Sequence, residues 1–176
     1  MSEPRVLETP RLRLRPFVPE DAEAMFAACT SRAECFRYLP WEPDTDLEQT
    51  RRRVEFWRRA GAFHWAITQR QGGGLVGYVN LHGVEPENGC AETTYLLSPE
   101  AWGRGYMTEA LAAVLDHAFG EAGLWRVAAD YYAGNDASGR VLERCGMRRE
   151  GVARDRYLKN GRRFDAIQYA VIRPDR

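Results

Sequence analysis

Two glycines and an arginine stand where a short turn would join an apolar segment to an amphipathic one. The run S-P-E-A-W-G-R-G-Y-M-T-E-A covers residues 98–110 and follows the apolar run Tyr95-Leu96-Leu97. Glycine adopts positive φ freely, so several backbone N–H groups of such a turn can converge on one anion. The N-terminus of a following helix adds partial positive charge, and Arg104 adds a full charge. The spacing indicates a phosphate site, although a turn with only a structural role fits it too.

Two common phosphate-binding patterns are absent from this turn. The sequence has no G-x-x-x-x-G-K-[ST], and Thr108 stands where a dinucleotide fingerprint would have its third glycine. A metal site is not indicated either, because the four cysteines and three histidines are scattered without zinc-ligand spacing. Free, mostly buried thiols in a reducing compartment account for the cysteines. We expect no bound metal.

The composition is that of an ordinary globular chain, which we expect to form one domain over residues 1–176. Lys and Arg together number 25, as do Asp and Glu, so the formal net charge is zero. Neither nucleic acid nor a membrane is therefore expected as a partner. No apolar run approaches the ~20 residues that cross a bilayer, and the first ten residues lack the apolar region of a signal peptide. These features predict a cytoplasmic protein.

The elements that must position the turn begin with an alternating strand over residues 11–15. Acidic residues then open a helix over residues 22–29, and a second helix is predicted over residues 47–60. In that second helix Val54 and Trp57 would face a core. Its many arginines could contact nucleic acid, but a solvated helix face is the simpler interpretation.

The rest of the chain alternates strands with two further helices. An apolar stripe predicts a long helix directly after the turn, and Asn135 is a natural N-cap for a short helix that ends before Gly146. Asn160-Gly161 predicts the turn of a closing hairpin. The stripe consists of Met107, Leu111, Val114, Leu115, Ala118 and Phe119. Strands are predicted over residues 63–68, 75–84, 91–97, 124–132, 148–158 and 163–172, which gives an α/β fold with a mixed sheet.

Four blocks, in order along the chain, resemble the GNAT superfamily of N-acetyltransferases and most closely its RimJ/RimL-like branch of ribosomal-protein N-terminal acetyltransferases. The run Y-L-L-S-P-E-A-W-G-R-G-Y-M-T-E-A, residues 95–110, is similar to the acetyl-CoA-binding motif. The run N-D-A-S-G-R-V-L-E-R-C-G-M-R-R-E-G, residues 135–151, resembles the N-x-x-S…G-F-x-x-E-G segment of that branch. Residues 7–17 are similar to its first strand, and residues 165–169 to its last.

The resemblance implies a single-domain GNAT-like fold, in which about four helices flank a mixed, mostly antiparallel, twisted sheet with a parallel split in its middle. It implies acetyl-CoA as co-substrate, with the pyrophosphate held by the turn's amides and the pantetheine arm paired with the preceding strand end. Asn135 would contact the cofactor from the far side of the split. The implied cofactor-binding residues are Leu96, Leu97, Ser98, Trp102, Gly103, Arg104, Gly105, Tyr106, Met107, Thr108, Asn135 and Ser138.

Two positions depart from the superfamily's pattern. Glu100 stands where many members have Gln or Arg, so Arg104 would have to compensate for its negative charge. Leu142 stands where many members place a tyrosine that acts as the acid. No tyrosine can act from that position here.

Glu92 is the candidate base for deprotonating an acceptor amine. It belongs to the strand that leads to the turn, and alternation places it with Thr94 and Leu96, opposite Ala91, Thr93 and Tyr95. The matching family segment, an A-E-I-G-Y-like stretch, commonly carries a glutamate there. The alternative is an ordinary solvent-facing strand residue.

Ser138 is the candidate acid, or at least a hydrogen-bond donor to the departing sulfur. Its alternative is a small residue in the first turn of a helix. Its surroundings, N-D-A-S-G, lack the G-x-S-x-G elbow of serine hydrolases. Cys145 as a nucleophile is disfavoured, because it lies on the apolar side of its helix.

The function implied is transfer of acetyl from acetyl-CoA to a primary amine, most of all the N-terminal α-amine of a protein or peptide. An α-amine has a pKa near ~8 and a lysine ~10.4, so at about pH 7.5 deprotonating lysine costs roughly 4 kcal/mol and the α-amine under about 1. The alternatives are a small-molecule amine acceptor (a polyamine, an amino acid or an antibiotic) and a non-catalytic acyl-CoA-binding module. The residues between the first two helices, 36–47, carry no signature of the acceptor, and Tyr38 and Trp41 could line its site or simply pack. A monomer and a homodimer are equally compatible with the sequence.

Overall fold

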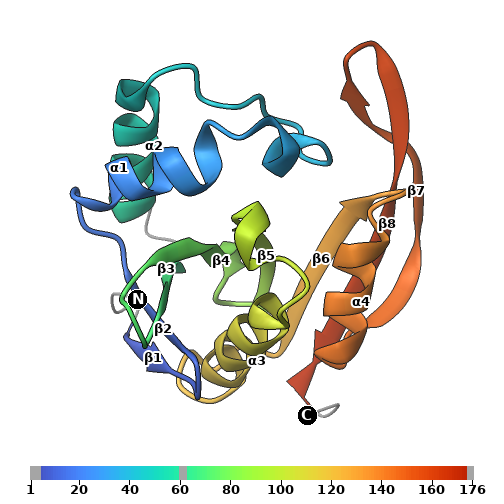
Figure 1. Cartoon of the computed structure of the whole chain (residues 1–176). Helices are drawn as coiled ribbons and strands as arrows, with labels where there is room; N and C mark the ends of the chain where they lie inside the picture. The colour runs from blue at the N-terminus through green and yellow to red at the C-terminus, as the bar shows by residue number, and fades with distance from the viewer. Residues whose placement is uncertain (1–4, 60–62, 174–176) are drawn as a thin grey trace.

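The structure is a computed structural model that describes residues 5–59 and 63–173. Its centre is one eight-stranded sheet with the strand order β1-β2-β3-β4-β5-β6-β8-β7 (Figure 1). All neighbouring strands are antiparallel except β5 and β6. The strands are β1 (Leu7–Glu8), β2 (Leu12–Pro16), β3 (Phe63–Gln69), β4 (Leu75–Glu85), β5 (Cys90–Leu97), β6 (Arg126–Tyr132), β7 (Arg148–Lys159) and β8 (Arg162–Ile172). The predicted mixed, mostly antiparallel sheet is confirmed.

The parallel pair at the centre of the sheet is short. Cys90–Glu92 of β5 faces residues 126–128 of β6, and beyond Glu92 the two strands part. The remainder of β5 stays paired with β4, and the remainder of β6 stays paired with β8. The sheet is therefore split between β5 and β6 at their carboxyl ends, as the resemblance implied.

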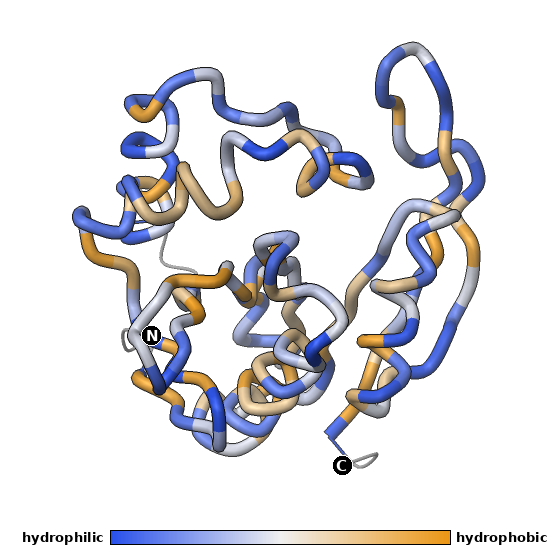
Figure 2. Tube along the Cα trace, viewed as in Figure 1, coloured by the Kyte–Doolittle hydropathy of each residue, from blue (hydrophilic) through white to orange (hydrophobic). Residues whose placement is uncertain are grey.

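Helices cover both faces of the sheet (Figure 1). On one face lie α1 (Asp21–Met25), which runs on into a π-helical turn, and α2 (Leu47–Arg59). On the other face lie α3 (Tyr106–Phe119) and α4 (Asp136–Arg144). Figure 2 shows α3 mostly apolar and the outer surface of α2 mostly hydrophilic, as expected for helices that bury one side.

Each face has its own core. The predicted stripe of α3 is fully buried against the sheet, in a cluster with Trp65, Ile67 and Leu81. On the opposite face Trp57 packs on Phe17 and Tyr78, with ring centroids 4.9 and 4.6 Å apart. The predicted burial of Val54 and Trp57 is thereby confirmed.

The predicted helix cap at Asn135 and the predicted hairpin turn at Asn160-Gly161 are confirmed. Asn135 caps α4, because its side chain accepts a hydrogen bond from the Ser138 N–H. Asn160 and Gly161 have φ of 50° and 72°, the left-handed values that a tight hairpin turn needs. The predicted helix over residues 22–29 is α-helical only to Met25 and ends in a π-helical turn, Phe26–Thr30. The predicted end of α2 at Ala60 lies outside the described residues.

The cysteines are mostly buried, as the sequence indicated. Cys29, Cys35 and Cys145 are buried, and Cys90 is partly exposed. In residues 5–59 and 63–173 no helix is both long and apolar enough to cross a membrane. The same residues contain no group of His, Cys, Asp and Glu that could hold a metal ion.

Candidate active site

The glycine turn has the backbone geometry that anion binding requires. Gly103 and Gly105 have φ of 72° and 75°, and α3 begins at the next residue, Tyr106. A Cβ added at Gly103 would meet no atom within 4 Å, so internal packing does not demand glycine there. The backbone conformation does, because side chains rarely adopt it. The turn therefore has a left-handed backbone with open space beside Gly103. This arrangement fits a phosphate group that accepts hydrogen bonds from its amides.

Two residues between β1 and β2, Thr9 and Arg11, hold this turn in place. Arg11 donates from Nη1 to the Arg104 carbonyl at 2.8 Å and from Nε to Glu109 Oε2 at 2.6 Å. Glu109 also accepts from the Thr9 hydroxyl at 2.6 Å. Burial would raise the pKa of Glu109, but the hydrogen bonds from Thr9 and Arg11 outweigh it and lower that pKa. The carboxylate thus fixes the turn to both α3 and β2.

The charges around the turn differ from the arrangement that the sequence suggested. Arg32 donates to Glu100 Oε1 at 3.0 Å, so the negative charge of Glu100 already has a cationic partner. The Arg104 guanidinium lies at the hydroxyl of Tyr106, where hydrogen bonds from Gln69 and then Arg104 lower the tyrosine's pKa. Arg104 is thus not needed to compensate for Glu100 and is available beside the turn.

The end of β5 offers a free edge on the side of the split. Beyond Glu92 no described strand pairs with β5 on its β6 side. The side chains of Leu96 and Leu97 are buried in the two opposite cores, and Ser98 N donates to the Val76 carbonyl at 2.8 Å. The indole N–H of Trp102 donates to the Leu97 carbonyl at 2.9 Å, which holds this exposed ring against the strand end. That edge is where the resemblance places the pantetheine arm.

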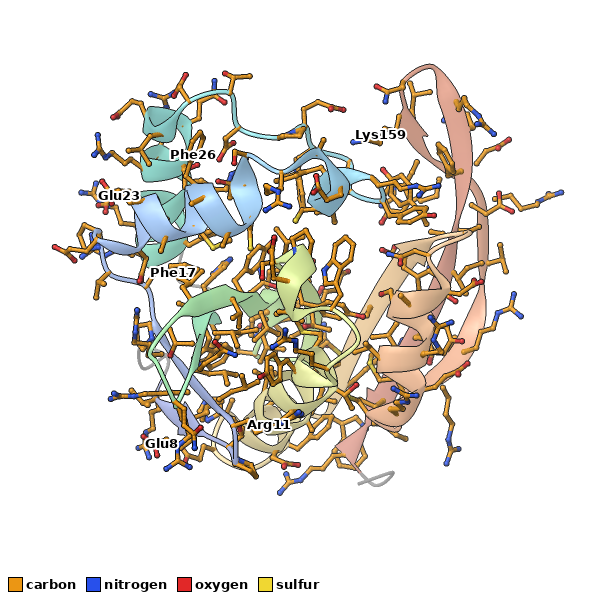
Figure 3. All side chains as sticks on the ribbon, in the orientation of Figure 1. Glu8, Arg11, Phe17, Glu23, Phe26 and Lys159 are labelled. Carbon is orange, nitrogen blue, oxygen red and sulfur yellow. The ribbon has the colours of Figure 1, made fainter. Side chains whose placement is uncertain are left out.

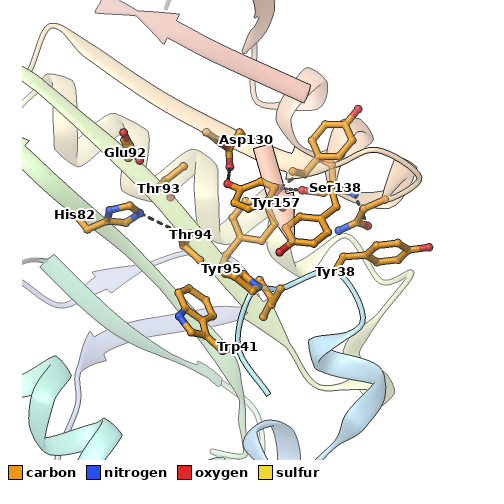
Figure 4. Close-up of a pocket in the computed structure, with 16 residues that line it drawn as sticks. Tyr38, Trp41, His82, Glu92, Thr93, Thr94, Tyr95, Asp130, Ser138 and Tyr157 are labelled. Carbon is orange, nitrogen blue, oxygen red and sulfur yellow. Dashed lines mark hydrogen bonds between the residues drawn. The ribbon is translucent and has the colours of Figure 1, made fainter. Parts of the chain in front are cut away.

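A cavity of about 220 Å³ lies at the split and brings together residues from distant parts of the chain (Figure 4). Both catalytic candidates, Glu92 and Ser138, line it, and so does Asn135. The turn residues 103–108 do not line it. The other lining residues are Tyr38, Leu39, Pro40, Trp41, His82, Thr93, Thr94, Tyr95, Ala129, Asp130, Tyr131, Tyr132 and Tyr157. Tyr38 and Trp41, whose role the sequence left open, therefore belong to the cavity wall.

Glu92 reaches this cavity from β5 on the face shared with Thr94, as alternation predicted. Its side chain is exposed and lies opposite His82 in the β4–β5 register. His82 in turn bonds Thr94, with 2.9 Å between Nε2 and Oγ1. Within residues 5–59 and 63–173 the Glu92 carboxylate has no hydrogen-bond or ion-pair partner, which leaves it free to accept a proton.

Ser138 meets a residue that sequence reasoning did not select. The Tyr95 hydroxyl lies 2.7 Å from Ser138 Oγ across the split. Burial raises the pKa of Tyr95 well above its usual range, so the phenol stays protonated. A phenol that donates to Ser138 Oγ leaves the serine's own proton free for another acceptor. Tyr95 stands in the quoted block next to the turn, but nothing in the sequence placed it against Ser138.

Three more residues of the cavity were missed, all from β6 and the closing hairpin. The Tyr157 hydroxyl donates to Asp130 Oδ1 at 2.6 Å, and the rings of Tyr157 and Tyr132 stack with centroids 4.3 Å apart. Burial, followed by the hydrogen bond to Asp130, raises the pKa of Tyr157. These contacts bring a carboxylate and two phenols to the wall facing Glu92.

A lysine ties the hairpin to the segment at residues 38–42, which we call the roof loop. Lys159 Nζ donates to the carbonyls of Leu39 and Trp41 at 2.8 and 2.9 Å and to Glu42 Oε1 at 3.1 Å. Figure 3 shows Lys159 between this loop and the hairpin tip. The roof loop is therefore held in place from the far end of the chain.

Residues 11–148 match the model of the acetyltransferase (GNAT) domain. The chain belongs to this family. This GNAT chain is 32% identical over 173 residues to the uncharacterized N-acetyltransferase YoaA of Bacillus subtilis (strain 168), covering 96% of this chain and 97% of YoaA.

Two further relatives extend the comparison. The [ribosomal protein uS5]-alanine N-acetyltransferase of Escherichia coli (strain K12) is 29% identical over 148 residues, 77% of this chain and 75% of that protein. The solved structure of RimL, a ribosomal L7/L12 alpha-N-protein acetyltransferase in complex with coenzyme A, has a TM-score of 0.87 and 24% identity, over 96% of this chain and 98% of that one. Relatives of this chain thus include RimJ/RimL-like proteins, and the chain is an N-acetyltransferase with the single-domain GNAT fold.

Proposed function

We propose that this GNAT protein transfers the acetyl group of acetyl-CoA to the N-terminal α-amine of a protein or peptide. The observation that carries the proposal is the cavity at the split, which holds Glu92 on one side and Ser138 with Tyr95 on the other. The cavity opens where β5 leaves β6, next to the strand end and glycine turn that suit the coenzyme. The similarity to the [ribosomal protein uS5]-alanine N-acetyltransferase of Escherichia coli supports an α-amine as the acceptor.

Glu92 would act on the incoming amine. Its unpartnered carboxylate removes the proton of the ammonium group, directly or through a water, so that the amine nitrogen can bond to the acetyl carbonyl carbon. An α-amine is the easier case, because its pKa near ~8 leaves a sizeable neutral fraction at neutral pH. His82 and Thr94 flank the carboxylate and limit where the amine can approach.

Ser138 would act on the departing sulfur once the carbon–sulfur bond breaks. The Tyr95 phenol donates to Ser138 Oγ, and the serine hydroxyl then donates to the thiolate. A thiol with a pKa near ~8.5 is mostly protonated at neutral pH, so the thiolate that this hydrogen bond stabilises finally takes up a proton from the solvent. The raised pKa of Tyr95 suits a donor that keeps its own proton.

The coenzyme itself fits the remaining residues proposed from the sequence. The amides of Gly103–Thr108 would hold the pyrophosphate, aided by Arg104, and the free edge of β5 at Leu96–Ser98 would pair with the pantetheine arm. Asn135 is placed across the split, where its side chain caps α4. We further propose one catalytic domain over residues 1–176, in the cytoplasm, as a monomer or homodimer.

A panel of acceptors tests the proposed function. Short peptides with free or acetylated N-termini, free lysine and a polyamine are incubated with acetyl-CoA, and acetylated products are measured by mass spectrometry. We expect turnover of free N-termini and none of the blocked ones. Turnover restricted to the polyamine or to lysine would contradict an α-amine acceptor and assign the enzyme to small-molecule amines.

A further inference from the structure

The acceptor cavity has a strongly one-sided charge. Of its lining residues, Glu92 and Asp130 are acidic and none is lysine or arginine. Among the described residues, three cations contact the wall from outside the lining. Lys159 spends its three N–H donors on the Leu39 and Trp41 carbonyls and on Glu42. The guanidinium groups of Arg37 and Arg156 lie over the rings of Tyr38 and Tyr157, 5.2 and 5.8 Å from the ring centroids. The charged side chains of the lining itself are thus both negative.

The two carboxylates come from neighbouring strands and share a face of the sheet. Glu92 pairs with Ala128 in the parallel register, and Asp130 follows Ala128 by two residues, so alternation returns it to the same face. Strands ~4.8 Å apart with a rise of ~3.3 Å per residue place the two backbone positions about 8 Å apart or more. One amine cannot occupy both carboxylates at that spacing.

A second observation is a polar group without a hydrogen-bond partner on the Asp130 side of the cavity. Tyr132 lines the cavity and is 2% exposed, yet its buried hydroxyl has no hydrogen-bond partner within the described residues. A buried hydroxyl normally finds a partner, because leaving it unpaired costs free energy. Its ring is held by stacking on Tyr157, whose own hydroxyl is satisfied by Asp130 Oδ1. Tyr132 and Asp130 are two residues apart on β6, so their side chains leave the same face of the strand, and both line the cavity.

We infer that Asp130 and the Tyr132 hydroxyl form a second ammonium-binding subsite, so that the preferred acceptors carry another positive charge several atoms from the acetylated amine. An ammonium group has three donors and no acceptor, which matches a carboxylate oxygen and a phenol oxygen on one wall. This subsite rests on the proposed function, because it takes the cavity to be the acceptor site.

Two kinds of acceptor supply this chemistry, a small diamine and a peptide with a basic residue near its N-terminus. Matched pairs of acceptors test the second charge, because the members of a pair are similar in size and differ in that charge. The pairs are 1,4-diaminobutane with n-butylamine, and Ala-Lys with Ala-Met peptides that have amidated C-termini. In each pair the charged member should have the higher kcat/KM by about tenfold or more, the usual size of one hydrogen bond to a charged group. If the diamine pair has the larger ratio of kcat/KM values, the preferred acceptor is a small diamine. If the peptide pair has the larger ratio, it is a peptide with a basic residue near its N-terminus.

Two variants locate the effect. Asp130→Asn keeps an oxygen for the Tyr157 hydroxyl but removes the charge, and Tyr132→Phe keeps the ring and removes only the unpaired hydroxyl. Both should reduce kcat/KM for the charged members while the uncharged members stay within about twofold. Glu87→Gln, which removes one exposed charge outside the cavity, is the matched control and should alter neither ratio.

Equal kcat/KM within both pairs, or equal losses for both members in Asp130→Asn and Tyr132→Phe, would overturn the subsite. Equilibrium binding of the same pairs in the presence of coenzyme A gives a separate answer. If no acceptor is turned over but 1,4-diaminobutane or Ala-Lys binds the parent more tightly than Asp130→Asn, the proposed function fails and the subsite stands. If Asp130→Asn binds every member of both pairs with the same affinity as the parent, the subsite is wrong, whichever acceptor the enzyme acetylates.

Discussion

The two sides of the split are built in opposite ways. The coenzyme side is one continuous segment, from Leu96 to Thr108, and it would bind mainly through backbone groups and two left-handed glycines. The acceptor side is assembled from side chains of the roof loop, β4, β5, β6 and β7. A backbone site constrains few side chains, whereas a side-chain site can change its ligand with single substitutions. The acceptor side is therefore where members of one fold can diverge in substrate.

Glu92→Gln tests the acceptor side most severely. The amide keeps the shape of the side chain but cannot take a proton, so the turnover rate should fall about 10²-fold or more. Acetyl-CoA affinity should stay within about threefold, because the proposed contacts begin at Leu96. Raising the pH should restore part of the rate, since more of the acceptor amine is then neutral. Stopped assays of rate against pH, with calorimetric binding of acetyl-CoA, measure both.

Ser138→Ala is the comparison variant for this experiment. It should lose rate through the leaving thiolate, so a higher pH should not rescue it through the amine. Near-parental turnover of Glu92→Gln from pH 6.5 to 9, a range that spans the α-amine pKa, would show that Glu92 is an ordinary strand residue.

Gly105→Val tests the coenzyme side. Gly105 has φ of 75°, a conformation that costs a side-chain-bearing residue roughly 1–2 kcal/mol and a β-branched one more. An added Cβ would lie 3.5 Å from Arg11 Nη2, an ordinary contact, so the damage comes from the backbone and its amides. Acetyl-CoA affinity should fall about tenfold or more, while pantetheine, which lacks the pyrophosphate, should bind parent and variant alike.

Gly73→Val is the matched control for backbone strain. Gly73 has φ of 66°, and a Cβ there would meet nothing within 4 Å, but this glycine lies in the β3–β4 turn. It should lose stability without losing coenzyme affinity. Unchanged acetyl-CoA affinity in Gly105→Val would contradict the proposal that this turn binds the pyrophosphate.

Glu109→Gln has the smallest effect and concerns the brace beneath the turn. Hydrogen bonds from Thr9 and Arg11 lower the pKa of Glu109 in the folded protein despite its burial. Its stabilising contribution is therefore present above the unfolded pKa of ~4.3 and is lost as the pH falls through the folded pKa. The variant should lose about 1 kcal/mol at pH 7 and little once the pH is below the folded pKa of Glu109. Urea unfolding of both proteins at pH 7 and at a series of acidic pH values measures this difference; a pH-independent difference would contradict the ion-pair brace.

Much of the fold could be predicted because its signals are local. The α3 stripe follows one helix face, Asn135 caps its own helix, and Asn160-Gly161 forms its own turn. The two-residue strand β1 and the π-helical end of α1 were missed, because both depend on packing rather than on propensity. The coenzyme residues were proposed from two blocks, residues 95–110 and 135–151, because both resemble the family's motifs.

The acceptor side was only partly predictable. Glu92 and Ser138 could be proposed from their positions in two blocks, but Tyr95 was missed because its contact with Ser138 crosses the split. Tyr157 reaches Asp130 only after a register shift between Ala153 and Tyr157 in the β7–β8 pair. A register shift of that kind decides which side chains face the cavity. The alternation of polar and apolar residues along β7 does not predict it.

The lysine that holds the roof loop also bears on how the molecule assembles. Leu39 and Lys159 are 120 residues apart, so their contact joins the first quarter of the chain to its last hairpin. Closing so long a loop is entropically costly, and contacts of this kind form late in folding. During synthesis, the glycine turn and α3 can fold as soon as they emerge with the strands before them, whereas the acceptor cavity has no complete wall until the final hairpin is made. The enzyme therefore acquires its proposed acceptor pocket only when nearly its whole chain is present.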